Sequence, residues 1–161
     1  MINKVSNIKT LTIDLGDFYP KGERVTLDIK CFLQEEILLK EKLFRIELEK
    51  YNWEIFKNKY VAIHCSSDTI LPSWTMMLIC AKLSPMALKV VKGDLVDLEN
   101  VIYQNIIDNI DLNPFKNKRV IINRCSKVMI PENAYLHLVQ KLRTVTTKIM
   151  YGEICSAVPL Y

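Results

Sequence analysis

The sequence predicts an α/β protein whose mostly parallel sheet is built from two repeated βαβ units and preceded by an N-terminal β-segment. Two observations lead to this fold class. The sequence matches itself when it is shifted by 59 positions, and each copy contains a β-branched run, a proline-opened helix and a second β-branched run in that order. A chain of 161 residues has the size of one domain. We therefore expect a single domain, residues 1–161, with an internal duplication.

The internal repeat is strongest over residues 56–93, which match residues 115–152 at twelve of thirty-eight positions without a gap. Random pairing at ordinary composition would give about two or three identities. The shared residues include a tetrapeptide, a proline and a glycine: Phe56–Lys59 and Phe115–Lys118, Pro72 and Pro131, Gly93 and Gly152. A weaker upstream match extends the two copies to about 35–93 and 94–152.

Each copy predicts four elements in the same order. The apolar spacing of residues 35–50 and 95–109 is helical, and short β-branched runs follow as strands. In the first copy we expect a strand at 60–63, a helix opened by Pro72 and a strand at 88–91. In the second copy we expect a strand at 119–122, a helix opened by Pro131 and a strand at 148–150. A strand, a helix and a strand in this order form a βαβ unit with parallel strands. We expect the two units to share one sheet with helices on its faces.

An N-terminal segment, residues 10–30, precedes the repeat. Residues 11–15 and 25–30 alternate apolar and polar side chains, as half-buried strands do. The sequence Phe-Tyr-Pro-Lys-Gly at 18–22 separates them and is typical of a loop. We expect this pair of strands to cap an edge of the sheet or to reach a partner subunit.

Composition narrows the possible functions. The formal charge is +4, but the basic residues are dispersed and form no stripe, so nucleic-acid binding is not indicated. The longest uncharged run, Thr69–Ala81, is too short to cross a bilayer, so no membrane partner is expected. The four glycines form no phosphate-binding loop motif. Five cysteines without a secretory signal predict reduced thiols in a cytoplasmic protein.

Three cysteines, Cys65, Cys125 and Cys155, are each followed directly by serine and each come after a predicted strand. Ligands of parallel α/β sheets bind at the carboxyl ends of the strands. If all three thiols lie at one edge of one sheet, they suit zinc or an iron–sulfur cluster. His64 is a further candidate ligand, although strand alternation turns it to the face opposite its neighbour. The sequence therefore predicts a metal or cluster site at this edge.

Other interpretations of these residues remain open. Free cysteines are often small buried hydrophobes, so the thiols can be purely structural. A nucleophilic Cys65 or Cys125 lacks a histidine at a convincing base position. Four residues before the predicted helices can cap them, or their backbone N–H groups can bind an anion: Ser66, Ser67, Asp68 and Ser126. Plain capping needs no ligand.

Three groups of residues together resemble a known bacterial family. They are Asp28–Lys30 with Leu39–Lys42 and Phe44–Arg45, then Val61–Ile63 with Cys65, Ser66 and Asp68, and the ending Gly152–Tyr161. The chain resembles, from about Leu11 to Tyr161, the family of domain of unknown function 2480. The resemblance implies a small cytoplasmic protein and assigns no catalytic residue. His64 departs from the family pattern, which weakens it as a ligand.

The sequence thus leads to two main hypotheses. The first is a binding protein whose cysteine–serine site holds a metal or an iron–sulfur cluster, with Cys65, Cys125 and Cys155 as ligands. The alternative is a non-catalytic, homodimeric interaction or structural module whose cysteines are packing residues. An enzyme that uses Cys65 or Cys125 comes third.

Overall fold

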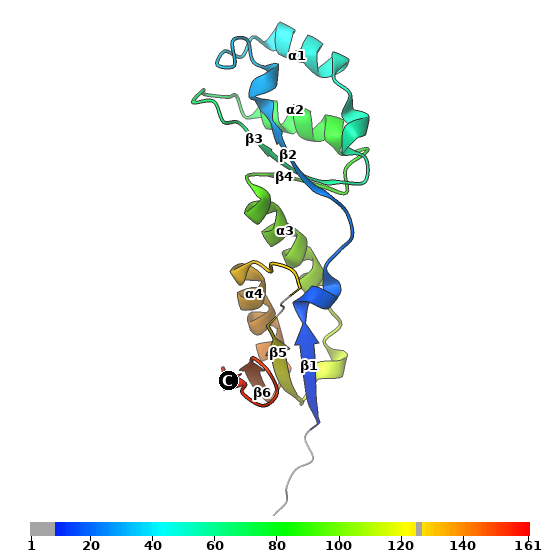
Figure 1. Cartoon of the computed structure of the whole chain (residues 1–161), viewed down its shortest axis with the longest axis vertical. Coiled ribbons are helices and arrows are strands. Elements are labelled where there is room, and N and C mark those ends of the chain that lie inside the picture. Colours follow the sequence, from blue (N-terminus) through cyan, green and yellow to red (C-terminus); the bar gives the residue numbers. More distant parts are fainter. Residues whose placement is uncertain (1–8, 125–126) are drawn as a thin grey trace, which may run out of the picture. The chain divides into compact units, whose positions relative to one another are not determined.

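The computed structural model of the chain describes residues 9–124 and 127–161. The chain divides into two compact units, which we call the central unit (Lys21–Ile102) and the terminal unit (Met1–Pro20 with Tyr103–Tyr161). Each unit has its own sheet, and helices accompany both sheets (Figure 1). The α/β class is confirmed. The expectation of one shared sheet is wrong, because the described strands form two separate sheets.

The central unit is built on a three-stranded, all-parallel sheet in the order β2-β3-β4. Its elements are β2 (Arg24–Asp28), the 3₁₀-helix η2 (Ile29–Phe32), α1 (Glu41–Lys50), η3 (Trp53–Phe56), β3 (Tyr60–His64), α2 (Trp74–Leu83), β4 (Lys89–Lys92) and the start of α3 (Leu95–Asp108). α2 connects the neighbouring parallel strands β3 and β4. β2 and β3 are parallel neighbours, so their carboxyl ends lie side by side at one edge of the sheet.

One apolar core holds the central unit together. Phe44 of α1 and the fully buried Ile79 and Leu83 of α2 share a cluster with Val61 and Ile63 of β3. Both helices lie along the same side of the sheet in Figure 1. Burial of these large side chains supplies the main favourable free energy of this unit.

The terminal unit contains a four-stranded sheet in the order β1-β5-β6-β7. Its elements are β1 (Thr10–Asp14), η1 (Leu15–Phe18), the last part of α3, η4 (Asn113–Phe115), β5 (Arg119–Asn123), α4 (Glu132–Arg143), β6 (Lys148–Tyr151) and β7 (Val158–Pro159). β1, β5 and β6 are parallel, and β7 runs antiparallel to β6. The buried Tyr103, Val120 and Leu138 belong to its core.

The two N-terminal strands do not form a pair with each other. β1 pairs with β5 in the terminal unit, and β2 pairs with β3 in the central unit. Each strand ends in an aspartate that caps a 3₁₀-helix: Asp14 accepts a 2.7 Å hydrogen bond from the Gly16 N–H, and Asp28 accepts one of 3.1 Å from the Lys30 N–H. Residues 10–30 therefore supply one edge strand to each sheet.

The tetrapeptides that recur in the sequence form the same turn before β3 and before β5. Asn58 has a φ of 58° and Asn117 a φ of 56°, a left-handed conformation that asparagine tolerates better than most residues. The Asn58 N–H donates to the Met86 carbonyl at 3.0 Å, and the Asn117 N–H donates to the Val145 carbonyl at 2.9 Å. Local backbone geometry explains why asparagine stands at both positions.

The segment before α1 differs from the expected helix over residues 35–50. Glu35 and Glu36 adopt φ values of 51° and 61°, which no helix contains. The Ile37 N–H donates to the carbonyl of Gln34, so residues 34–37 form a tight turn. The helix itself begins at Glu41.

Candidate functional site

Asp28 stands at the carboxyl end of β2, beside His64 at the end of β3. Its Oδ1 accepts hydrogen bonds from the backbone N–H groups of Lys30 and Ser66, both at 3.1 Å. Its Oδ2 accepts a 2.5 Å hydrogen bond from the Ser66 hydroxyl, and His64 Nε2 lies 3.9 Å from the same oxygen. The carboxylate therefore joins the end of β2 to the loop that follows β3.

The environment of Asp28 favours its ionised form. Partial burial raises the pKa of the carboxyl group, but the hydrogen bonds from the Ser66 side chain and backbone, that from Lys30 and the charge of His64 outweigh this effect. The pKa of Asp28 is consequently lowered from its ordinary value of 3.8. The group is a carboxylate at neutral pH, which fits its role as a hydrogen-bond acceptor.

Two polar atoms in the same loop region are buried without a hydrogen-bond partner among the described residues. They are His64 Nδ1 and Ser67 Oγ. Buried polar atoms are usually paired, so this region has unused hydrogen-bonding capacity. His64 makes no hydrogen bond to Ser66 within the described part of the chain, so these residues do not form a serine–histidine catalytic pair.

The predicted ligand-binding residues have different surroundings. The Ser66 N–H, which the sequence offered to an external anion, already donates to the carboxylate of Asp28. α2 begins at Trp74 and its N-cap is Ser73, so Ser66, Ser67 and Asp68 do not cap this helix. Asp68 is exposed. The fourth predicted residue, Ser126, lies outside the described residues. Asp28 thus acts as an internal anion for this loop.

The two predicted cysteine ligands that the structure describes follow strands of different sheets. Cys65 follows β3 of the central sheet, whereas Cys155 follows β6 of the terminal sheet; Cys125 lies outside the described residues. Cys65 packs against the central core, and its Sγ lies 3.7 Å from the Ser67 carbonyl oxygen. Cys155 is exposed. The two-sheet topology therefore removes the premise of the metal hypothesis.

Across residues 9–124 and 127–161, no group of three or more His, Cys, Asp or Glu side chains is arranged to hold a metal ion. The zinc or iron–sulfur interpretation is therefore not supported. The prediction that the cysteine–serine pairs form one site assumed that all strands belong to a single sheet. The common edge on which the shared site depended does not exist in this topology.

Cys31, to which no role was predicted from the sequence, lies in η2 close to Asp28. Partial burial and the negative charge of Asp28 together raise the pKa of its thiol above the ordinary value of 9.0. Partial burial and the charge of Cys31 likewise raise the pKa of Tyr51. The Cys31 thiol is therefore protonated at neutral pH and poorly suited to nucleophilic chemistry.

His137, on α4, has a structural partner. Its Nε2 lies 2.7 Å from Asp108 Oδ1 at the end of α3. The pair joins two helices of the terminal unit. This agrees with the interpretation of His137 as a partly exposed helix residue, since its side chain is one-third exposed.

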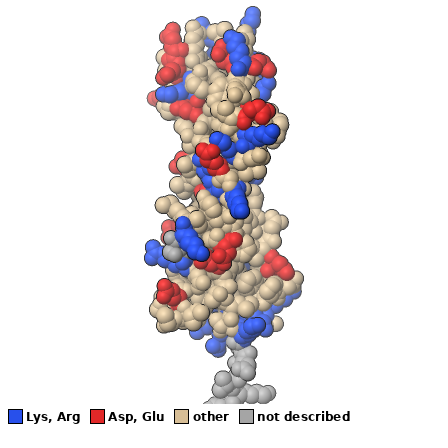
Figure 2. Space-filling model, turned by 45° about the vertical axis from the view of Figure 1, so that its right-hand side comes forward, with Lys and Arg blue, Asp and Glu red and all other residues tan. Residues whose placement is uncertain are grey.

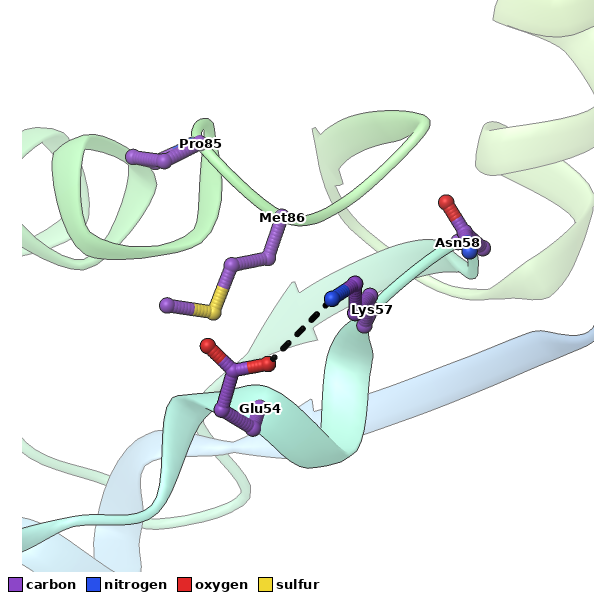
Figure 3. A pocket seen from close by; sticks show the side chains of 5 residues that line it. All are labelled: Glu54, Lys57, Asn58, Pro85 and Met86. Atoms are coloured by element: carbon purple, nitrogen blue, oxygen red, sulfur yellow. Dashed lines mark ion pairs between the residues drawn. The ribbon is translucent and has the colours of Figure 1, made fainter.

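A shallow pocket of about 280 Å³ lies at the opposite, amino-terminal end of β3 and β4. Figure 3 shows its lining side chains, which are Glu54, Lys57, Asn58, Pro85 and Met86. Glu54 Oε2 and Lys57 Nζ are 3.9 Å apart, and both are largely exposed. Asn58, one of the lining residues, belongs to the turn whose positive φ recurs at Asn117.

The outer face of α2 has an unusual composition. Four exposed residues at helical spacing define this face, which we call the α2 surface: Ser73, Met77, Ala81 and Ser84. The repeat offset of 59 pairs them with four exposed residues of α4: Glu132, Leu136, Gln140 and Arg143. The α2 surface carries no charge, whereas its counterpart carries two. The uncharged run Thr69–Ala81, which is too short to cross a bilayer, contains three of these four residues and is the sequence signal for this surface.

The charges elsewhere are mixed. Figure 2 shows Lys and Arg side chains interspersed with Asp and Glu over the visible face. Five ion pairs of the central unit join lysine to glutamate: Lys30–Glu36, Lys50–Glu47, Lys57–Glu54, Lys59–Glu23 and Lys82–Glu49. Exposed pairs of this kind contribute little to stability individually. The α2 surface, by contrast, carries no charged residue.

The fold and the site define a small α/β protein with two sheets and a carboxylate-centred polar cluster at one sheet edge. The chain belongs to the family described as "Protein of unknown function (DUF2480)", whose model matches residues 1–161. The resemblance found in the sequence is therefore confirmed. No curated protein and no solved structure matches the chain. None of the helices in the described part is long and apolar enough to cross a membrane.

Proposed function

We propose that the protein is a non-catalytic interaction module that forms a homodimer through the α2 surface. The observation that carries this proposal is the absence of charge on an exposed helix face. Within α2 the only charged residue is Lys82, and its Nζ bonds Glu49 Oε1 of α1 at 2.6 Å. The large apolar side chain on this face, Met77, is mostly exposed, and removing apolar surface from water is favourable. The exposed face of α2 therefore calls for a covering partner.

The matching helix in the terminal unit supports this argument. α4 holds the same position in its strand–helix–strand segment, yet its exposed face carries Glu132 and Arg143. Fold position alone therefore does not require an uncharged face. The Ser84 hydroxyl donates to the Cys80 carbonyl at 2.6 Å within its own helix, which further reduces the polarity of the α2 surface.

A second copy of the chain is the occupant that the chemistry favours. A two-fold axis brings a patch against itself, so any net charge on the patch would repel its copy. The α2 surface has no such charge, and it combines a long side chain, Met77, with the small side chains of Ser73, Ala81 and Ser84. Met77 is 69% exposed, and covering it would contribute about 1–2 kcal/mol per copy. Small neighbours allow two helices to approach closely.

The polar cluster around Asp28 fits a structural role in this proposal. The Ser66 hydroxyl donates to Asp28 rather than to an imidazole, so no base activates it as a nucleophile. Both oxygens of Asp28 already accept hydrogen bonds. The cluster anchors the loop between β3 and α2, which precedes the α2 surface.

We further infer that the two units arose as copies of one strand–helix–strand unit. Equivalent turns at Asn58 and Asn117 support the inference, as do positive φ values of 134° at Gly93 and 119° at Gly152. The aspartates Asp14 and Asp28, which cap equivalent 3₁₀-helices, extend the correspondence to the N-terminal strands. The uncharged exposed face of α2, which α4 lacks, then marks where the central unit acquired a separate role.

Sedimentation equilibrium tests the proposed dimer. The wild-type chain is expected at twice its mass of 18.7 kDa, and Met77→Glu is expected to weaken the dimer at least about a hundredfold because two buried charges would face each other. Leu136→Glu is the matched control on α4 and should leave the dimer intact. A monomeric wild type, or a dimer that survives Met77→Glu, would refute the proposal.

A further inference from the structure

We propose that the free edge of β4 is a docking site for an extended, acidic peptide segment of a partner protein. This inference is independent of the dimer through the α2 surface, because it concerns a different element. β4 is the outer strand of the central sheet and pairs only with β3 among the described strands. An edge strand presents unpaired backbone groups that can accept a further strand.

The terminal unit shows how such an edge is completed. β6, which matches β4 at the offset of 59, is covered by β7 in antiparallel register, with Met150 opposite Pro159 and Tyr151 opposite Val158. The Leu160 N–H adds a 2.8 Å hydrogen bond to the Ile149 carbonyl. The same strand position thus binds an antiparallel segment within this molecule.

The chain cannot cover β4 in the same way, because it turns into α3 directly after Gly93. The Asp94 carboxylate accepts hydrogen bonds from the N–H groups of Val96 and Asp97, at 2.8 and 2.9 Å, and Asp97 Oδ2 accepts one from the Asp94 N–H at 3.0 Å. These bonds start a helix at the point where the terminal unit continues towards β7. A strand that covers β4 must therefore come from elsewhere.

The charges on β4 favour an acidic peptide at its free edge. Lys89 and Lys92 flank the two valines of β4, and neither lysine has an ion-pair partner among the residues that the structure describes. An antiparallel pair of two β4 strands in the register that uses the whole strand would put Lys89 of one copy opposite Lys92 of the other, which is repulsive. A segment with glutamates three positions apart would instead put a carboxylate opposite each lysine. The edge therefore favours an acidic peptide over a second copy.

Both the backbone and the side chains of β4 can contribute to binding of such a peptide. Backbone hydrogen bonds to the edge provide sequence-independent affinity, and side chains opposite the strand provide specificity. Leu88, which is 48% exposed, and the half-buried Val90 and Val91 offer apolar contact beside the lysines. The segment recognised is therefore acidic at both ends and apolar in between.

The test uses the full chain and two synthetic peptides, Ac-Thr-Glu-Val-Val-Glu-Thr-NH2 and its Lys-for-Glu counterpart, each at about 1 mM because single-strand contacts are weak. Amide hydrogen exchange and ¹⁵N-resolved NMR shifts are the measurements. The acidic peptide is expected to protect β4 amides and shift their signals, and the basic peptide is expected to do neither. Equal effects of both peptides, or no protection of β4, would overturn the proposal.

Two variants check the charge contribution. Lys89→Glu with Lys92→Glu is expected to weaken binding of the acidic peptide about tenfold or more, because two attractive cross-strand pairs become repulsive. Lys148→Glu is the matched control, since it lies at the same position of β6, whose edge is already paired. Unchanged affinity in the double variant would contradict the proposal, and if that variant does not fold, the two peptides on the wild-type chain decide.

Discussion

The ammonium group of Lys141 donates a 2.5 Å hydrogen bond to the carbonyl oxygen of Ile107, in the last turn of α3. The same Nζ bonds the Asp108 carbonyl, so α4 supplies a cation to a helix end that has no basic residue of its own. At the equivalent position, Lys82 of α2 bonds Glu49 of α1. One lysine position therefore joins neighbouring helices in each unit.

Replacement of Lys141 by methionine should destabilise the protein. The change keeps the aliphatic stem but removes the charge and both hydrogen bonds at the end of α3, which we expect to lower the free energy of unfolding by about 1–2 kcal/mol. Urea unfolding followed by circular dichroism measures the effect. Lys116→Met is the control, because Lys116 is exposed and its side chain makes no ion pair within the described chain; equal losses in both variants would contradict a capping role.

Ser66→Ala should raise the pKa of Asp28 towards its ordinary value of 3.8, because it removes the 2.5 Å hydrogen bond that favours the carboxylate. A lowered carboxyl pKa stabilises the fold above the unfolded value and loses this contribution as the pH falls through the folded value. The stability difference between wild type and Ser66→Ala should therefore shrink below about pH 3.8.

Carboxyl ¹³C NMR titration and urea unfolding at pH 6 and pH 2 measure these two effects. Ser156→Ala is the control, since Ser156 is exposed and its side chain makes no hydrogen bond within the described chain. An Asp28 pKa that does not move in Ser66→Ala would show that the hydroxyl does not stabilise the charge.

Asp28→Asn should make the Cys31 thiol more reactive at neutral pH. The negative charge of Asp28 contributes to the raised pKa of Cys31, so its removal lowers that pKa and increases the thiolate fraction. The rate of iodoacetamide labelling as a function of pH measures the shift in a chain whose other four cysteines are replaced by serine. Asp68→Asn should leave the labelling profile unchanged, and the opposite ranking of the two variants would exclude the electrostatic explanation.

Gly93→Ala should cost more stability than Gly152→Ala. Both glycines have φ values above 100°, which strain any other residue by about 1–2 kcal/mol. A Cβ at residue 93 would in addition collide with the Asp97 carboxylate that helps to start α3, whereas at residue 152 it would make ordinary contacts. Thermal unfolding of the two variants measures the difference, and a larger loss in Gly152→Ala would show that the start of α3 tolerates the added group.

The sequence predicted elements better than their assembly. Local apolar spacing located α3 and α2 within a residue or two, and the β-branched runs located β3 and β5. It missed the turn at Glu35 and Glu36, because glutamate rarely adopts a positive φ and the charge pattern there resembles that of α1.

The choice of sheet was not predictable from local patterns. β1 and β2 both alternate apolar and polar residues, and nothing in that alternation states that β1 pairs with β5 while β2 pairs with β3. The predicted metal site depended on this choice, and the described residues do not support it. The cluster around Asp28 was missed for the same reason, since Asp28 meets Ser66 only when β2 lies beside β3.

The pairing of β1 with β5 also bears on how the chain acquires its structure during synthesis. The central unit is one continuous stretch of chain, so its strands can find one another soon after they are made. β1 is made before the other described strands and must stay unpaired through roughly a hundred further residues before β5 exists. Contacts between such distant segments form slowly, and an apolar strand stays exposed until they form. Refolding kinetics should accordingly show the central unit gaining amide protection ahead of the terminal one.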